Sequence, residues 1–239
     1  MRAGSGGFQM PQMQTVASRL AVAVGVVSLA CMLVPGLVGW VALVPDRVLS
    51  HFAFWQLVTY PFVAGDVLGL LFGVMTIWSV GGMMERTWGP RRLLTFCFAM
   101  AALSGALTLL LAFALPGLRY SLIPGAWTVA TALWVAMGLY IGRGQANFWG
   151  MPTTGNVLAL IGAAFALISL VQGAAQGVPN LISAALTFAY MRGLGPKRVW
   201  LRFQSWNLRR QTRSRSKHLR VIGGKNANQS THGSDRFLH

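Results

Sequence analysis

Charged residues are scarce along most of this 239-residue chain. Only 10% of its residues are charged, whereas 54% are hydrophobic. A soluble protein of this length could not cover its surface with so few ionic groups. The composition therefore excludes an ordinary soluble domain and predicts an integral membrane protein.

Cysteine is also rare, and its placement excludes two kinds of site. Cys31 and Cys97 are the only cysteines, and each lies within an apolar run. A disulfide framework and a cysteine-based metal site both need more thiols at other spacings. We expect two buried thiols that pack as small hydrophobic groups, with no metal ion and no cofactor.

Acidic residues number only four, against 20 basic ones that gather near the C-terminus. Residues 1–191 carry a formal charge of +5 and residues 192–239 carry +11, which together give the +16 of the chain. The high isoelectric point of about 11.8 therefore describes a tail and does not indicate a nucleic-acid-binding domain.

Apolar runs long enough to cross a membrane occur six times. A hydrocarbon core about 30 Å thick needs about 20 apolar helical residues for each crossing. The sequence thus predicts an all-α, polytopic bundle of six transmembrane helices over residues 18–192. The predicted spans are residues 18–43, 66–84, 92–114, 121–142, 154–173 and 177–192.

The distribution of cations predicts the orientation of this bundle. If residues 1–17 form a cytoplasmic segment, then only Arg47 and Arg119 lie outside, and residues 193–239 form a basic cytoplasmic tail. Lys and Arg are retained on the cytoplasmic side of short loops. We expect an inner-membrane protein of a bacterium with both termini in the cytoplasm. The alternative, a lipoprotein signal ending at Cys31, does not fit an apolar run that continues beyond that residue.

Aromatic residues are dense in the segment from residue 45 to residue 65, which joins the first two spans. It is too long for a tight turn, and Phe54, Trp55 and Tyr60 are unusual in a solvated loop. Aromatic rings suit the headgroup layer, where one edge meets lipid and the other meets water. We expect these three side chains to lie at the membrane interface.

Arginines alternate with aromatic residues along the juxtamembrane part of the tail. Such a segment is typical of a basic surface that lies on anionic lipid. A single-stranded nucleic acid is the alternative partner, but headgroups are the nearest polyanion, so we expect no nucleic acid. The expected lipid contacts are Arg202, Arg209, Arg210, Arg213 and Arg215.

A dense pattern extends from residue 54 to residue 93. It reads FWQLVTYPF at 54–62, LGLLFG at 68–73 and GGMMERTWGPRRL at 81–93. The pattern resembles the stretch of the rhomboid intramembrane proteases that runs from the first outer loop through the second helix into the third. The resemblance implies a six-helix, rhomboid-like bundle.

The resemblance also identifies the positions at which catalytic groups would stand. Rhomboid proteases use a serine on the fourth span, a histidine on the sixth, and a histidine and an asparagine on the second. Here those positions hold Trp127, Asn180, Gly69 and Gly73, respectively. Serine catalysis needs a nucleophile, a base and donors for the oxyanion, so the resemblance implies a rhomboid-like protein without peptidase activity.

Replacement groups are absent from the predicted spans. The four histidines are His51, in the outer loop, and His218, His232 and His239, in the tail, where all three lysines also lie. Inactive relatives of rhomboids bind transmembrane helices of client proteins, and we expect the same here. Two alternatives remain: an active intramembrane serine protease, and a small transporter or channel, for which a charged site within the spans is missing.

Two structural contacts are also predicted. Glu85, Arg86, Gly89 and Arg92 are expected to tie the end of the second span to the start of the third, because a carboxylate at the membrane edge needs a guanidinium partner. The indole of Trp127 is expected to fill the former active-site space and to donate to Asn180.

Overall fold

The computed structural model describes residues 15–148 and 151–193, and most of these residues are helical. Four helices are long and apolar enough to cross a membrane, and two shorter apolar helices accompany them. The predicted all-α, polytopic membrane fold is confirmed. The long elements are α1 (Val16–Leu33), α5 (Val67–Thr76), α7 (Pro90–Ala114), α9 (Ala126–Ile141), α10 (Gly155–Gln172) and α11 (Ala174–Met191).

Shorter elements join these helices at both ends of the bundle. The second membrane span is continuous from Val67 to Trp88, because a π-helical turn links α5 to α6. A small antiparallel hairpin that the sequence did not predict joins α9 to α10. The short elements are α2 (Leu37–Val41), α3 (Pro45–His51), α4 (Gln56–Thr59), the 3-10 turn η1 (Tyr60–Phe62), the π-turn η2 (Ile77–Gly81), α6 (Gly82–Trp88), α8 (Pro116–Arg119), β1 (Gln145–Phe148) and β2 (Met151–Thr154).

The predicted first span, residues 18–43, is wrong at its C-terminal boundary. Helix α1 ends at Leu33, two residues before Pro35, and Gly36 has a φ of 86°. Proline lacks the N–H that would continue a helix, and glycine adopts the left-handed conformation without strain. The apolar run therefore turns here and continues as the separate helix α2.

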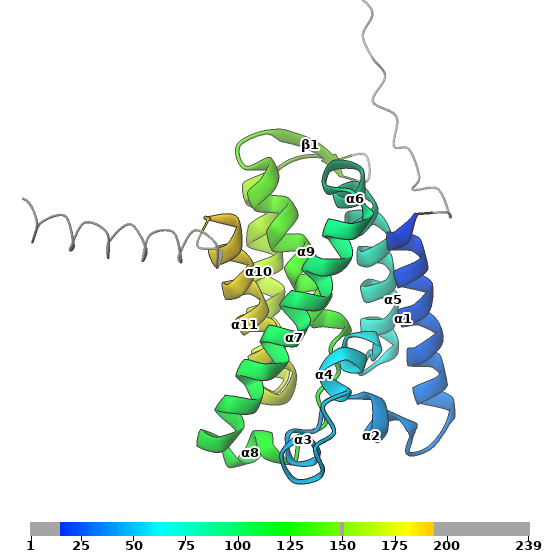
Figure 1. The fold of residues 1–239 in the computed structure, drawn as a ribbon. Helices are drawn as coiled ribbons and strands as arrows, with labels where there is room; N and C mark the ends of the chain where they lie inside the picture. The colour runs from blue at the N-terminus through cyan, green and yellow to red at the C-terminus, as the bar shows by residue number, and fades with distance from the viewer. Residues whose placement is uncertain (1–14, 149–150, 194–239) are drawn as a thin grey trace, which may run out of the picture. The chain divides into compact units, whose positions relative to one another are not determined.

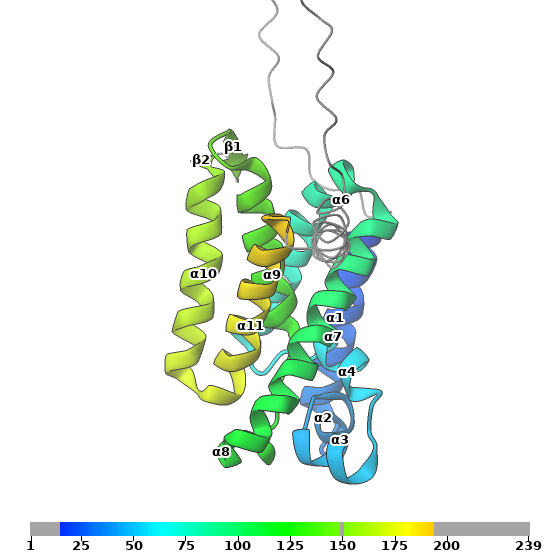
Figure 2. The ribbon, with the colours of Figure 1, turned by 60° about the vertical axis from the view of Figure 1, so that its left-hand side comes forward.

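Helix α9 occupies the centre of the bundle, between α5 and α7 on one side and α10 and α11 on the other (Figures 1 and 2). Its closest neighbour is α10. A Cβ atom on Gly138 would lie 2.2 Å from the backbone nitrogen of Ala159, so glycine is required at this crossing. Small residues allow such close approach of membrane helices.

The chain that leads into α9 is buried and held by backbone hydrogen bonds. Leu43 and Ile123 exchange two such bonds, with N–O distances of 3.1 and 2.9 Å, and the N–H of Gly125 donates to the carbonyl of Tyr60 at 3.0 Å. Buried backbone groups need internal partners in a membrane protein. These bonds supply them and fix where α9 begins.

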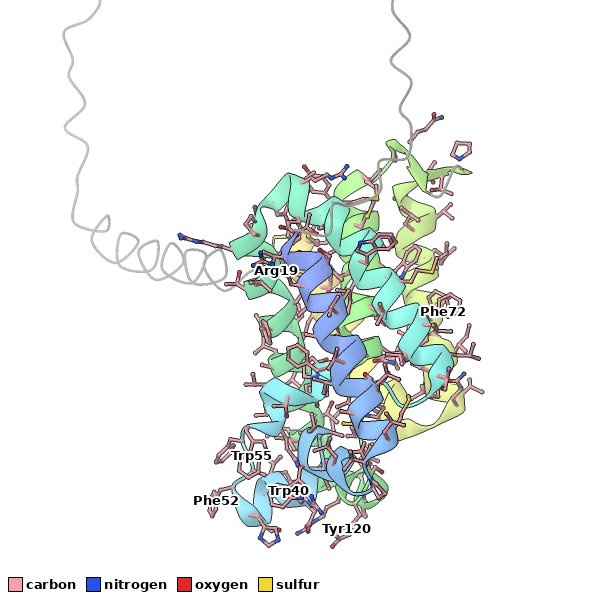
Figure 3. All side chains as sticks on the ribbon, turned by 90° about the vertical axis from the view of Figure 1, so that its right-hand side faces the viewer. Arg19, Trp40, Phe52, Trp55, Phe72 and Tyr120 are labelled. Atoms are coloured by element: carbon pink, nitrogen blue, oxygen red, sulfur yellow. The ribbon has the colours of Figure 1, made fainter. Side chains whose placement is uncertain are left out.

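The two ends of the bundle differ in composition. We name the end with α6 and the β-hairpin the arginine-rich end, and the end with α2, α3 and α8 the aromatic-rich end (Figures 1 and 3). The described arginines of the first are Arg19, Arg86, Arg91, Arg92, Arg143 and Arg192. The exposed aromatic residues of the second are Trp40, Phe52, Phe54, Trp55 and Tyr120.

Candidate functional site

The four positions that the resemblance identifies come from three helices that meet in the bundle. Gly69 and Gly73 lie one helical turn apart on α5. Trp127 lies in the first turn of α9, and Asn180 lies on α11. Helix α9 contacts both α5 and α11, so it separates the glycine pair from Asn180.

The indole of Trp127 lies against Gly69. A Cβ atom at position 69 would be 2.7 Å from the Nε1 atom of Trp127 and 2.6 Å from a carboxylate oxygen of Asp66. That same oxygen accepts the N–H of Gly69 and so caps the start of α5. A side chain at position 69 and the indole in its present place therefore exclude each other.

Aromatic rings from two further helices hold the other faces of this indole. The Phe72 ring of α5 lies 6.2 Å from the Trp127 ring, at an interplanar angle of 23°. The Phe165 ring of α10 lies 5.6 Å away, at 47°. Figure 3 shows Phe72 on the flank of α5 where α10 lies. Trp127 thus bridges α5 and α10 by ring contacts, which are favourable at such distances.

Asn180 is buried, and both the nitrogen and the oxygen of its amide bond to hydroxyl groups. Its side-chain nitrogen donates to the Oγ atom of Ser169 at 3.0 Å, and its oxygen accepts from the Oγ1 atom of Thr128 at 2.9 Å. Ser183 also donates to the backbone carbonyl of Thr128, at 2.9 Å. These bonds join α9, α10 and α11 at one level of the bundle.

The predicted hydrogen bond from Trp127 to Asn180 is therefore wrong. Successive residues of an α-helix point about 100° apart. When Thr128 faces Asn180 on α11, Trp127 must face α5 and α10 instead. The contact with Asn180 on α11 is made by Thr128, the residue next to the one to which the sequence analysis assigned it.

We name the hydrogen-bonded group of Thr128, Ser169, Asn180 and Ser183 the polar seam. Further buried hydroxyls extend it along α7, α9 and α11. Ser104 on α7 donates to the carbonyl of Pro179 at 2.7 Å, and Thr108 donates to the carbonyl of Ser104 at 2.8 Å. Among the described residues, the Oγ1 atoms of Thr131 and Thr187 are buried without a hydrogen-bond partner. The seam is uncharged throughout.

The seam contains alcohols but no group that could activate one. An asparagine amide cannot take a proton from a hydroxyl at neutral pH, whereas serine and threonine nucleophiles depend on a base. The single histidine of the described residues, His51, lies at the end of α3. Within residues 15–148 and 151–193, no three His, Cys, Asp or Glu side chains gather where they could hold a metal ion.

Glu85 contacts a different helix from the one predicted. Its two carboxylate oxygens accept the N–H groups of Val16 and Ala17, at 3.0 and 2.8 Å. The first N–H groups of a helix lack partners within it, and the helix dipole favours an anion there. Glu85 therefore joins the end of the second span to the start of the first, and the predicted tie to the third span is corrected.

The corner between α6 and α7 holds the other residues of this predicted motif. Gly89 has a φ of 83°, which lets the chain reverse before Pro90 begins α7. The guanidinium of Arg92 lies 4.9 Å from the centre of the Trp88 ring. Arg86, on α6, is exposed.

The predicted interfacial residues divide into two kinds. Phe54 and Trp55 are exposed at the aromatic-rich end, whereas Tyr60 is fully buried. The Tyr60 hydroxyl donates to the carbonyl of Ala101 at 2.6 Å, and burial raises the pKa of this hydroxyl above its ordinary value. Placing Tyr60 in the headgroup layer is therefore wrong, because it anchors the loop to α7.

Sequence reasoning missed Gln56 beside it. Gln56 is buried, accepts the N–H of Val44 at 3.0 Å and donates to the carbonyl of Gly39 at 3.1 Å. Cys31 and Cys97 are buried and free. The predicted lipid contacts of the tail lie outside the described residues: Arg202, Arg209, Arg210, Arg213 and Arg215.

Comparison with known proteins gives one family. No curated protein matches the chain. Residues 18–203 match the family described as "Eukaryotic integral membrane protein (DUF1751)". This match covers more than half of the chain. That description does not fit the expected bacterial inner membrane, and the coarser prediction of an integral membrane protein is confirmed. The chain belongs to this family of integral membrane proteins.

Proposed function

We propose that this protein is a rhomboid-like membrane protein without peptidase activity that binds transmembrane helices of other proteins. The observation that carries the proposal is the filling of both catalytic positions. Trp127 lies against Gly69, where its indole leaves no room for a side chain, and the Asn180 amide is occupied by Thr128 and Ser169. A scaffold of this kind retains a surface for helices and lacks the groups for cleavage.

The flank between α5 and α10 supports a surface for client helices. Trp127 bridges the two helices through Phe72 and Phe165, and apolar residues such as Leu68 and Leu160 are exposed on either side. Ring contacts have no fixed hydrogen-bond geometry, so these side chains can adjust to a helix that packs against them. We assign the client surface to this flank.

The charge distribution supports an orientation for this surface. Six of the eight described arginines lie at the arginine-rich end, and the positive-inside rule assigns such an end to the cytoplasm. We propose that both termini of the chain are cytoplasmic.

Site-specific photocrosslinking tests the client surface. A photoreactive amino acid would replace Leu68 on α5 or, as the control, Val22 on α1. The exposed fractions of these two residues are 67% and 64%, so a crosslinker is equally accessible at both positions. We expect a single-span peptide in the same liposomes to crosslink several-fold more at position 68. Equal yields at the two positions would contradict helix binding on this flank.

A separate measurement tests the absence of cleavage. The full-length protein in liposomes would be treated with a fluorophosphonate probe and with a fluorogenic single-span substrate. We expect no labelling and no product, because the hydroxyls of Thr128, Ser169 and Ser183 are bonded to an amide or to backbone carbonyls and not to a base. Labelling of any serine or threonine within the spans would overturn the non-proteolytic assignment while leaving helix binding open to the crosslinking result.

A further inference from the structure

Charge is distributed unequally between the two ends of the bundle. Among the described residues, the arginine-rich end has six arginines and one carboxylate, that of Glu85. The aromatic-rich end has Arg47 and Arg119 together with Asp46 and Asp66. The formal charges are therefore +5 at one end and zero at the other.

The carboxylates at the two ends also have different partners. At the aromatic-rich end, Asp46 forms an ion pair with Arg119 at 3.0 Å. At the arginine-rich end, both oxygens of Glu85 accept backbone N–H groups of α1. Within the described part of the chain, Glu85 is thus the one carboxylate at this end, and its oxygens bond to backbone N–H groups.

We propose that the arginine-rich end binds the phosphate groups of anionic phospholipids in the adjacent leaflet, with Arg91 and Arg92 as the central contacts. Both side chains are exposed on the first turn of α7. Guanidinium groups bind phosphate through paired, charge-assisted hydrogen bonds. This inference rests on charge and side-chain placement and is independent of the proposed function.

Aromatic packing holds Arg92 in position for such a contact. Its guanidinium lies 4.9 Å from the centre of the Trp88 ring. That ring packs edge-on against Phe96 at 5.2 Å and Tyr140 at 6.3 Å. A cation held over a fixed ring loses little conformational freedom when it binds an anion. Tryptophan beside arginine is also typical of the headgroup depth of a membrane.

The position of these arginines on α7 is unfavourable without an anion. The positive end of a helix dipole repels cations, and helices usually carry acidic residues there. The first turn of α7 has no acidic residue and has Arg91 and Arg92 instead. A bound phosphate would attract both the guanidinium groups and the positive end of the helix dipole. Phosphate binding therefore explains why Arg91 and Arg92 lie in the first turn of α7.

Lipid is a better candidate than the rest of the chain for the counter-charge. Residues 192–239 carry a formal charge of +11, so the tail has the same sign as this end and cannot neutralise it. An anionic leaflet attracts cations at its surface. The phospholipid headgroup is therefore the partner whose charge complements this surface.

Two matched double variants of the full-length protein test the proposal. R91Q/R92Q removes two charges from the arginine-rich end, and R47Q/R119Q removes two from the aromatic-rich end. Native mass spectrometry in detergent would measure binding of short-chain phosphatidylserine, with phosphatidylcholine as the neutral lipid. A cation near an anionic surface contributes a factor of about five in affinity, so we expect R91Q/R92Q to bind phosphatidylserine at least about fivefold more weakly.

The controls separate this site from other sources of binding. We expect R47Q/R119Q and all phosphatidylcholine titrations to remain unchanged, and inorganic phosphate to compete poorly. A third variant would replace Arg202, Arg209, Arg210, Arg213 and Arg215 by Gln. The proposal is overturned if only this tail variant loses phosphatidylserine, or if the two double variants lose it equally. Thermal unfolding of each variant in the same detergent would show that the fold persists.

Discussion

Two neighbouring residues of α9 serve opposite sides of the bundle by different kinds of contact. Trp127 faces α5 and α10 through aromatic rings, whereas Thr128 faces α11, where its hydroxyl donates to Asn180 and its carbonyl accepts from Ser183. Hydrogen bonds between buried groups need a defined geometry, and ring packing tolerates small shifts. The difference indicates a fixed side at α11 and an adjustable side at α5, on the same helix.

The largest effect is expected on the fixed side. Asn180→Leu keeps the side-chain size but removes the acceptor of the Thr128 hydroxyl and the donor to Ser169, whose own hydroxyl still donates to the carbonyl of Ala166. Each unpaired polar group costs about 1 to 3 kcal/mol, and bonds inside membrane proteins lie near the lower end. We expect the free energy of unfolding in detergent micelles to fall by about 2 to 3 kcal/mol.

A second substitution on this background separates unpaired hydroxyls from poor packing. Thr128→Val removes one of the orphaned groups, so N180L/T128V should recover part of the stability that N180L loses. If the loss of stability in N180L/T128V equals the sum of the losses in N180L and T128V, the two residues are not coupled. The hydrogen bond between them would then contribute nothing measurable to stability.

A smaller effect is expected on the adjustable side. Gly69→Ala places a Cβ atom 2.7 Å from the Nε1 atom of Trp127, so the indole must move. Overpacking of this kind costs about 1 to 2 kcal/mol, measured by thermal unfolding. Gly73→Ala is the matched control one turn away, where the nearest atom to the new Cβ would be 3.6 Å distant, and we expect it to be neutral or slightly stabilising.

The same pair tests whether Trp127 is the group that excludes a side chain at position 69. On a Trp127→Ala background, the cost of Gly69→Ala should shrink, because the ring that it strikes is gone. An undiminished cost would assign the clash to Asp66, whose carboxylate oxygen lies 2.6 Å from the new atom, and would remove the argument that Trp127 fills the former catalytic space.

The sequence predicts the parts of this molecule that depend on one helix at a time. Run length and composition locate the spans, and Pro90 after Gly89 marks a boundary by local chemistry. Partners between helices follow from rotation and neighbour choice, which a single sequence does not contain. Glu85 was thus assigned to the third span when it caps the first, and Trp127 was assigned the contact that Thr128 makes.

The position of Tyr60 was predicted wrongly for a related reason. Aromatic composition predicts interfacial depth on average, and Phe54 and Trp55 are indeed exposed. The hydroxyl of Tyr60 instead finds a carbonyl on α7, so its ring enters the core with its polar atom satisfied. Composition alone cannot separate a tyrosine that meets water from one that meets a buried acceptor.

The smallest effect is expected at Thr187, where the fixed side carries a hydroxyl that it does not use. The Oγ1 atom of Thr187 is buried without a partner, so Thr187→Val removes a desolvated polar group at nearly constant shape. We expect stability to be unchanged or to rise by up to about 1 kcal/mol. Thr108→Val is the control, since Thr108 donates to the carbonyl of Ser104 at 2.8 Å and should lose stability. If Thr187→Val is as costly as Thr108→Val, an ordered water bonds to the Thr187 hydroxyl. The hydrogen-bonded contact between α9 and α11 would then extend about two helical turns beyond Asn180, toward the C-terminal end of α11.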